Sequence, residues 1–265
     1  MPGFTSFHKL YDNMATPSPL VEMRNICKNF GGLQALNDAH LDLYPGEVVG
    51  VLGHNGAGKT TLMKVLAGAQ TATSGEIRIE GQKVTIKDPT DARSYGIETI
   101  YQELALCGNL DAPANLFMGR EKNKWGFLLK REMKRETEKA MSKLGIRIKS
   151  VDSDVEIMSG GQRQSISIGR AVHFDAKIII MDEPTAALGI EESKKVIELI
   201  CDLKSHGIGI LWISHDIHDV YNYTDRIVIF HGGRNVINAK TEDFTQNEIV
   251  SMIISGLPII KDAAK

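Results

Sequence analysis

One glycine-rich segment of the sequence has the residue types and spacing of a phosphate-binding loop. It reads Gly53, His54, Asn55, Gly56, Ala57, Gly58, Lys59, Thr60 and Thr61, and its first eight residues match G-x-x-x-x-G-K-[ST]. The glycines allow backbone N–H groups to come close to a polyphosphate. We expect Lys59 to reach the β- and γ-phosphates and the Thr60 hydroxyl to bind magnesium. The segment therefore predicts a nucleoside-triphosphate site.

Two adjacent carboxylates supply the second candidate for chemistry. Asp182 and Glu183 directly follow the run 177–181, which is typical of a buried strand because it is apolar after Lys177. Ligands of open α/β sheets collect at the carboxyl ends of the strands. We expect Asp182 to bind magnesium, through water, and Glu183 to act as general base on the attacking water. The alternative is a helix cap, which the phosphate-binding loop earlier in the chain disfavours.

These residues need a sheet to position them, and the hydrophobic pattern predicts one. Short apolar runs alternate with amphipathic stretches, which indicates an α/β fold with a mostly parallel sheet. Residues 103–172 lack this alternation and predict a mainly helical insertion. The expected strands are 21–28, 39–43, 47–52, 75–80, 96–101, 177–181, 208–213, 226–230 and 236–239, and the expected helices are 58–67, 130–144, one beginning at Gly161, 191–206, 215–221 and 246–254.

Composition sets limits on the function. The chain has 265 residues and a formal net charge of −2, so nothing favours a nucleic-acid partner. The three scattered cysteines indicate reduced, buried thiols. No apolar stretch approaches the ~20 residues of a membrane span. Residues 1–19 lack the apolar core of a secretory signal and are expected to form a tail, as are residues 258–265. Any membrane role must then come through a partner.

Three further motifs carry a resemblance to a known family. Met158-Ser159-Gly160-Gly161-Gln162 resembles the L-S-G-G-Q signature loop of ATP-binding-cassette ATPases, with Met158 in place of the usual leucine. Tyr101-Gln102-Glu103 resembles the family's glutamine loop, and Ile213-Ser214-His215-Asp216 resembles its switch-histidine loop. Together with the phosphate-binding loop and the acidic pair, these motifs extend the resemblance over about residues 20–257, as a single domain.

The resemblance implies a P-loop NTPase core, with an antiparallel β part near the N-terminus and a helical signature subdomain at about 103–172. It implies ATP and Mg²⁺ as ligands. Gln102 would contact magnesium and water, His215 would contact the γ-phosphate, and Phe30 would stack on adenine. The signature residues Ser159, Gly160, Gly161 and Gln162 would contact ATP held by a second copy of the chain. One departure is Gly189, which stands where the family usually has aspartate.

Three stretches resemble the ATPases of carbohydrate importers of the fructose and ribose class, namely 30–36, 115–121 and 184–189. Cys107-Gly108 departs from them, because proline is frequent there in those relatives. This resemblance implies a homodimer at the cytoplasmic face of the membrane, soluble when isolated. Its partners would be membrane permease subunits and, indirectly, a sugar-binding protein. The alternatives are a cassette of another transport system, or a soluble cassette acting on ribosomes or DNA, or as a regulator.

Overall fold

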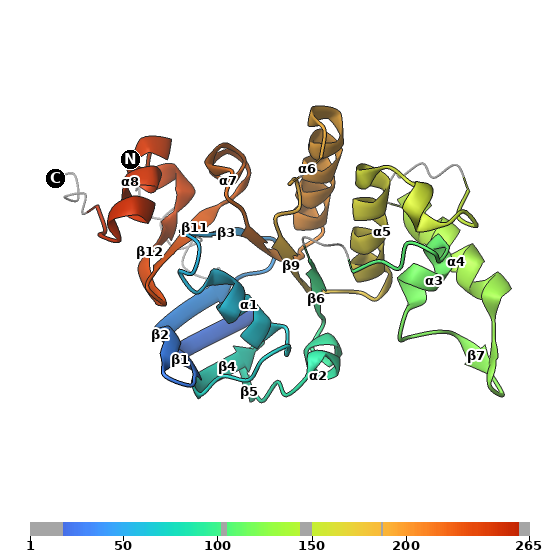
Figure 1. Ribbon diagram of the computed structural model, residues 1–265, viewed down its shortest axis with the longest axis horizontal. Helices are drawn as coiled ribbons and strands as arrows, with labels where there is room; N and C mark the ends of the chain where they lie inside the picture. Colours follow the sequence, from blue (N-terminus) through green and yellow to red (C-terminus); the bar gives the residue numbers. More distant parts are fainter. Residues whose placement is uncertain (1–17, 102–104, 144–149, 187, 260–265) are drawn as a thin grey trace, which may run out of the picture.

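The computed structural model describes residues 18–101, 105–143, 150–186 and 188–259 (Figure 1). Most of the expected tail 1–19, the end of the expected tail 258–265 and Gln102 lie outside these ranges. The elements follow in the order β1 (Val21–Phe30), β2 (Leu33–Leu43), β3 (Val48–Gly53), α1 (Lys59–Leu66), β4 (Ser74–Ile79), β5 (Gln82–Val84), α2 (Pro89–Ser94), β6 (Ile97–Ile100), α3 (Ala112–Phe117), β7 (Asn123–Lys124), β8 (Phe127–Leu128), α4 (Lys130–Lys143), α5 (Gly160–His173), β9 (Ile178–Asp182), α6 (Ile190–Ser205), β10 (Gly209–Ile213), α7 (Ile217–Tyr223), β11 (Arg226–His231), β12 (Arg234–Lys240) and α8 (Gln246–Ser255).

A six-stranded sheet forms the centre of the molecule, in the order β12-β11-β3-β10-β9-β6. Only the edge pair β11–β12 is antiparallel, and the other neighbours run parallel. The strands β3 and β10 are buried along their whole length, as expected of a parallel sheet covered on both faces. The predicted α/β fold with a mostly parallel sheet is therefore confirmed.

A second sheet accounts for the expected antiparallel part near the N-terminus. Its order is β2-β1-β4-β5, and each neighbouring pair for which a register is given is antiparallel. One hydrophobic core joins this sheet to helix α1 and to one face of the central sheet, through Val49 and Val51 of β3. The opposite face packs against α6 through Trp212 and Met181. The central strands are thus fixed from both sides.

The helices α3, α4 and α5 form a separate region with its own core, on the right of Figure 1. Phe117 and Ile166 are fully buried in it. This agrees with the helical character expected for residues 103–172, although the assignment of those bounds as a subdomain stays a prediction. The short hairpin β7–β8 within the region was not expected. No described helix is long and apolar enough to span a membrane.

Some predicted bounds differ from the structure. Strand β2 begins at Leu33 rather than at residue 39, because pairing with β1 continues through Phe30 and Leu33 despite several irregularities in register. Helix α7 begins at Ile217 rather than at His215, because the Asp216 side chain accepts from the backbone N–H groups of His218 and Asp219 and so fixes the helix start. The cysteines are free, as expected, but Cys107 and Cys201 are exposed rather than buried.

Candidate functional site

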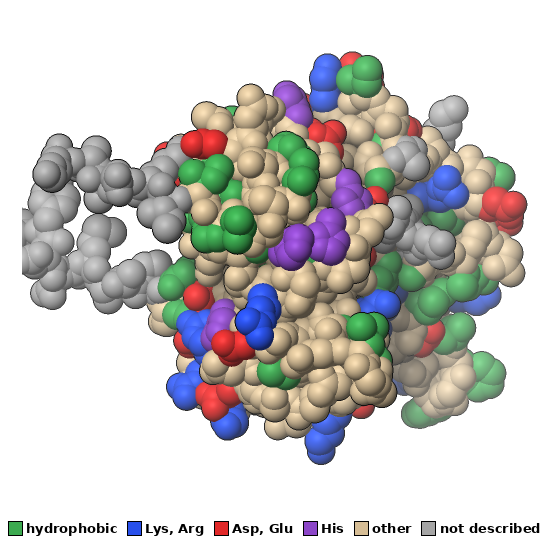
Figure 2. Space-filling view, turned by 60° about the vertical axis from the view of Figure 1, so that its left-hand side comes forward, with side chains coloured by type: hydrophobic (Ala, Val, Ile, Leu, Met, Phe, Trp, Pro, Cys, Tyr) green, Lys and Arg blue, Asp and Glu red, His purple; other side chains and the backbone are tan. Residues whose placement is uncertain are grey.

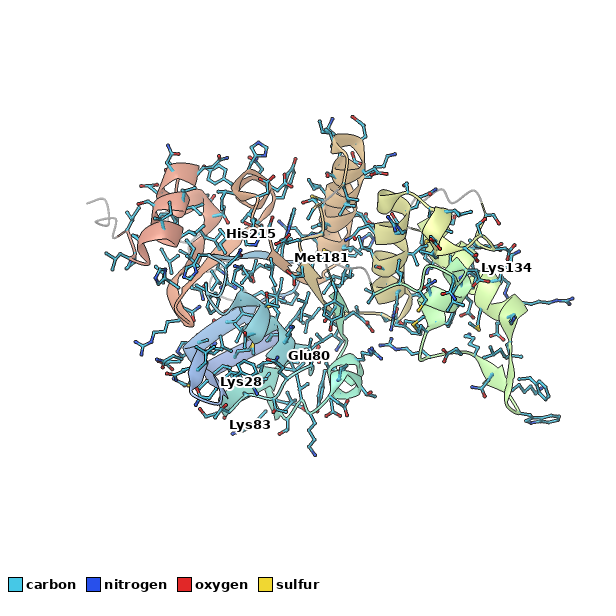
Figure 3. The ribbon with its side chains drawn as sticks, viewed as in Figure 1. Lys28, Glu80, Lys83, Lys134, Met181 and His215 are labelled. Carbon is cyan, nitrogen blue, oxygen red and sulfur yellow. The ribbon has the colours of Figure 1, made fainter. Side chains whose placement is uncertain are left out.

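Three segments that lie far apart in the sequence converge on one open cavity of about 450 Å³. They follow β3, β9 and β10, whose carboxyl ends lie next to one another because the strands pair in parallel register. Figure 3 shows His215 and Met181 near the middle of the molecule, far from the helical region that contains Lys134. The cavity is lined by Ala35, Asn55, Gly56, Ala57, Gly58, Lys59, Thr60, Thr61, Asp182, Glu183, Ile213 and His215.

The phosphate-binding loop has a backbone that requires glycine at its two ends. Gly53 has φ 145°, and a Cβ atom there would lie 2.3 Å from the Phe230 carbonyl oxygen. Gly58 has φ 106°, and a Cβ atom there would lie 3.0 Å from the Ala35 carbonyl oxygen. Helix α1 then begins at Lys59, so that its positive end faces the loop. The loop is therefore built to receive an anion.

Replacing Gly53 tests this geometry. We expect Gly53→Ala to lower the free energy of unfolding by about 2–5 kcal/mol. Alanine would have to adopt a left-handed backbone conformation, and its Cβ atom would clash with the Phe230 carbonyl oxygen. The matched control is Gly56→Ala, since Gly56 also has positive φ (81°) but no atom within 4 Å of the added Cβ. That variant should lose only about 1–2 kcal/mol. Urea denaturation measures both, and equal losses would contradict the proposed clash with Phe230.

The Lys59 side chain lies within the loop that precedes it. Its Nζ donates hydrogen bonds to the carbonyl oxygens of Gly53 and His54, with N–O distances of 2.7 and 3.0 Å. Burial lowers the pKa of Lys59, and the charges of Asp182 and Glu183 partly oppose this shift. The ammonium group is thus held at the cavity by carbonyl groups, which a phosphate group could replace as partners.

The acidic pair and the histidine are also in contact. Glu183 has φ 51°, a left-handed conformation that is uncommon for glutamate, and its N–H donates to the Ile213 carbonyl oxygen at 2.9 Å. Its carboxylate lies 2.9 Å from Nε2 of His215. Glu183 is mostly buried, whereas half of the His215 side chain is exposed. Glu183 is thereby positioned at the cavity, with a titratable neighbour.

Asp182 has the properties of a cation ligand. Burial and the charge of Glu183 raise the pKa of Asp182, while Lys59 and His215 oppose that rise. A divalent cation beside it would favour the ionised carboxylate. The Thr60 hydroxyl is exposed and lines the same cavity, so two oxygen donors of the kind that Mg²⁺ prefers are present. These residues fit the predicted magnesium site.

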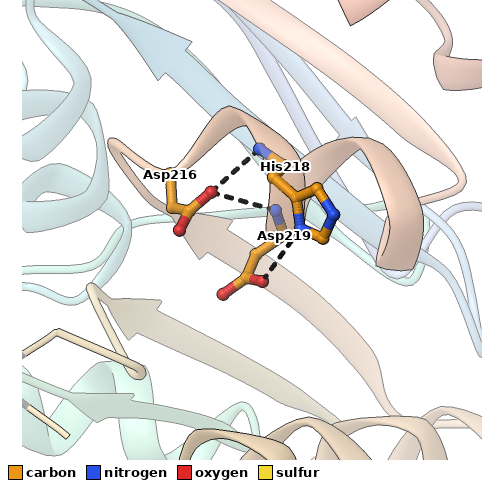
Figure 4. Close-up of side chains that lie close together, drawn as sticks. All are labelled: Asp216, His218 and Asp219. Carbon is orange, nitrogen blue, oxygen red and sulfur yellow. Dashed lines mark hydrogen bonds and ion pairs between the residues drawn. The ribbon is translucent and has the colours of Figure 1, made fainter. Parts of the chain in front are cut away.

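A neighbouring group, Asp216, His218 and Asp219, brings three possible ligand atoms within 4.8 Å of one another (Figure 4). The hydrogen bonds of these three residues explain why they lie close together without invoking a metal ion. Asp216 accepts from the N–H groups of His218 and Asp219 and caps α7. Asp219 accepts from the Thr185 hydroxyl at 3.2 Å. The group therefore serves the start of α7 and the segment that follows Glu183.

The signature residues lie outside this cavity, at the start of α5. The Ser159 hydroxyl accepts from the Gln162 N–H, and the Gln162 side chain accepts from the Ser159 N–H. This capping box fixes the first turn of the helix, with Ser159 exposed to solvent. The signature segment thus forms the N-terminus of α5, and it does not line the same cavity as the phosphate-binding loop of its own chain.

Sequence reasoning missed Glu192, which contacts these residues. Its carboxylate accepts from the Gly189 N–H at 3.4 Å and lies close to Ser159 and Gly161. Ser159, followed by the N–H groups of Gly189 and Gly161, lowers the pKa of Glu192. A capping box is a local sequence signal for a bond from Glu192 to Gly189. No local pattern relates Glu192 to Ser159, because they are 33 positions apart in the sequence.

Two other predicted residues, Phe30 and His54, are not among the residues that line the cavity. Phe30 is 43% exposed at the end of β1, close in sequence to Ala35, which lines the cavity. The Lys28 ammonium lies 5.0 Å from the centre of its ring. His54 of the loop makes an edge-on contact with His231, with ring centres 4.7 Å apart. Figure 2 shows histidine side chains gathered on one face of the molecule.

Comparisons with known proteins agree with this geometry. A family model described as ABC transporter matches residues 36–186. The chain is 44% identical over 238 residues to a xylose/arabinose import ATP-binding protein of Sulfolobus acidocaldarius, covering 90% of this chain and 95% of that protein. It is 41% identical to a fructose import ATP-binding protein of Rhizobium meliloti, covering 89% and 94%.

A ribose import ATP-binding protein of Yersinia pestis is 42% identical, but the chain spans only 47% of its length while 91% of this chain is covered. A crystal structure of the ADP conformation of an ATP-binding cassette of an ABC transporter matches with a TM-score of 0.76 and 27% identity, covering 89% of this chain and 95% of that one. A nucleotide-free cassette matches with a TM-score of 0.78, 26% identity and the same coverage.

Proposed function

Because this chain belongs to the ABC transporter family, we propose that it binds and hydrolyses ATP to power a membrane importer of a monosaccharide. The observation that carries the proposal is the cavity that joins Lys59, Asp182, Glu183 and His215. The sugar class is supported by the printed names of the xylose/arabinose, fructose and ribose relatives. Resemblance to these relatives favours sugar import over the alternative of another transport system.

The proposed chemistry assigns one role to each residue of the cavity. The loop N–H groups and Lys59 hold the β- and γ-phosphates of ATP. Thr60 and Asp182 would hold Mg²⁺, which neutralises charge on the phosphates when it is bound. Glu183 accepts a proton from water as the water oxygen bonds to the γ-phosphorus, and the bond from that phosphorus to ADP breaks. His215 lies 2.9 Å from Glu183 and orients its carboxylate.

Gln102 is proposed to contact magnesium and the attacking water, although it lies outside the described residues. It follows β6, whose carboxyl end lies beside that of β9 in parallel register. Phe30 is proposed to stack on adenine, since it is exposed at the end of β1, in the same hairpin as Ala35, which lines the cavity. His54, Asn55, Gly56, Ala57 and Thr61 are proposed to complete the nucleotide contacts through the loop.

The functional unit is proposed to be a homodimer that holds two ATP molecules. The cavity is open, and Ser159, Gly160, Gly161 and Gln162 do not line it within the same chain. An exposed helix start with a serine hydroxyl is suited to bind an anion from a second copy. Each signature segment would then close over the γ-phosphate held by the partner. Gly189 lacks the carboxylate that the family usually places at this interface.

Membrane permease subunits are the proposed partners, with a sugar-binding protein acting indirectly through them. A smaller pocket of about 110 Å³ lies between the core and the helical region, and Tyr101, Leu106 and Arg170 help to line it. Tyr101 and Leu106 lie on either side of Gln102 in the sequence, so a permease loop held at this pocket would sense the nucleotide. Such an assembly places the chain at the cytoplasmic face of the membrane.

The test is ATPase activity of the purified chain, alone and with permease-containing membranes from its own source, across a panel of monosaccharides. We expect magnesium-dependent activity that rises at least several-fold with the permease and one sugar. Membranes without the permease are the control. An ATPase rate that changes with neither membranes nor sugars would agree with the ATPase assignment and would contradict the assignment to a sugar importer.

A further inference from the structure

A carboxylate of the same chain already lies against the signature segment. Glu192 lies in the first turn of α6, next to Gly160 and Gly161, and Ser159 and the Gly161 N–H are close enough to lower the pKa of its carboxyl group. The approach is close, because a Cβ atom added to Gly161 would lie 3.4 Å from the carboxyl carbon of Glu192. A Cβ atom added to Gly160 would lie 3.9 Å from Oε2 of Glu192.

These donors are the ones that the proposed function assigns to the γ-phosphate. Ser159 offers a hydroxyl, the first turn of α5 offers N–H groups, and the positive end of a 14-residue helix adds to both. A carboxylate and a phosphate oxygen accept from the same kinds of donor. The Glu192 carboxylate can therefore compete with a phosphate for these donors.

Gly189 explains why the carboxylate can lie there. The Glu192 carboxylate also accepts from the Gly189 N–H, with an N–Oε2 distance of 3.4 Å. Gly189 has φ −68°, which any residue can adopt, so the backbone does not require glycine. A Cβ atom at that position would lie 3.9 Å from Oε2 of Glu192. An aspartate there would bring a second negative charge next to Glu192 and would repel it from this position.

We propose that Glu192 acts as a latch on the signature segment: its carboxylate lies against the donors of that segment, and ATP held by the partner must displace it. The inference rests on the homodimer of the proposed function. Two anions cannot share these donors, since unit charges about 4 Å apart repel strongly near a protein surface. The latch therefore raises the ATP concentration at which the dimer closes, and it keeps the signature segment ordered until then.

The experiment measures dimer formation by sedimentation velocity at increasing Mg-ATP concentration. All proteins carry Glu183→Gln, which slows ATP hydrolysis, so that the ATP-bound dimer persists during the measurement. We expect the added change Glu192→Gln to lower the half-maximal ATP concentration roughly 5- to 20-fold. The matched control is Glu191→Gln, which removes the same charge from the same helix turn. Glu191 is exposed and pairs with Lys194, so this change should have less than about a 2-fold effect.

The outcomes separate the latch from the function on which it rests. If the dimer forms but Glu192→Gln requires as much ATP as the control, or more, the latch is wrong and the homodimer stands. If none of the proteins dimerises with ATP, the proposed homodimer is wrong, and so is the latch that depends on it. Hydrogen exchange at the Gly161 amide in the nucleotide-free protein checks the contact itself. Glu192→Ala should speed exchange there, and an unchanged rate would overturn the inference.

Discussion

Glu183→Gln is expected to slow ATP hydrolysis about 10²–10⁴-fold, which is the usual contribution of a general base. The amide keeps the size of the side chain but cannot accept the proton of the attacking water. The contact at 2.9 Å from His215 can persist as a hydrogen bond, so the geometry of the cavity should change little. Phosphate release measured at saturating Mg-ATP checks the rate, and binding of a fluorescent ATP analogue checks that the affinity for nucleotide is retained.

The control for this variant is Glu191→Gln, which makes the same chemical change at an exposed position. Its rate should stay within about 2-fold of the original protein, as is usual for surface substitutions. Near-normal hydrolysis by Glu183→Gln would remove Glu183 from the reaction. Loss of nucleotide binding in that variant would show instead that Glu183 supports the structure of the cavity, through its unusual backbone conformation.

The central fold could be predicted because its strands carry strong local signals. The segments of β3, β9 and β10 are short, apolar and rich in β-branched residues, and each is buried on both faces in the structure. Their carboxyl ends therefore had to meet at one edge of a sheet. That reasoning placed Lys59 and Asp182 near one another, and the family resemblance added His215. The structure brings all three into one cavity.

The rest depended on contacts that no local pattern encodes. The hairpin β7–β8 has strands of two residues each, which is too short for an alternating pattern. Arg120 of the helical region pairs with Glu98 of β6 and so joins that region to the core. The contact from Glu192 to Ser159 depends on α5 and α6 packing side by side. Such pairings follow from the tertiary arrangement, whereas the sequence pattern indicated only the alternation of strands and helices along the chain and missed α2 and α3.

The second large effect is expected from Lys59→Ala, which should weaken ATP binding by about 10- to 10³-fold. One or two charge-assisted hydrogen bonds to phosphate would be lost, each contributing about 1.5–3 kcal/mol. The loss is increased because Asp182 and Glu183 would then face the phosphates without the cation that now lies beside them. Isothermal titration with Mg-ATP measures the affinity directly.

Lys64→Ala is the matched control, since Lys64 is an exposed lysine on the same helix α1. It changes the net charge equally but should leave the affinity within about 2-fold. Because the Lys59 ammonium is now held by the carbonyl oxygens of Gly53 and His54, its removal also leaves those two groups without this partner. Circular dichroism and urea denaturation distinguish a local loss from unfolding. Unchanged ATP affinity in a folded Lys59→Ala protein would show that the backbone N–H groups alone bind the phosphates.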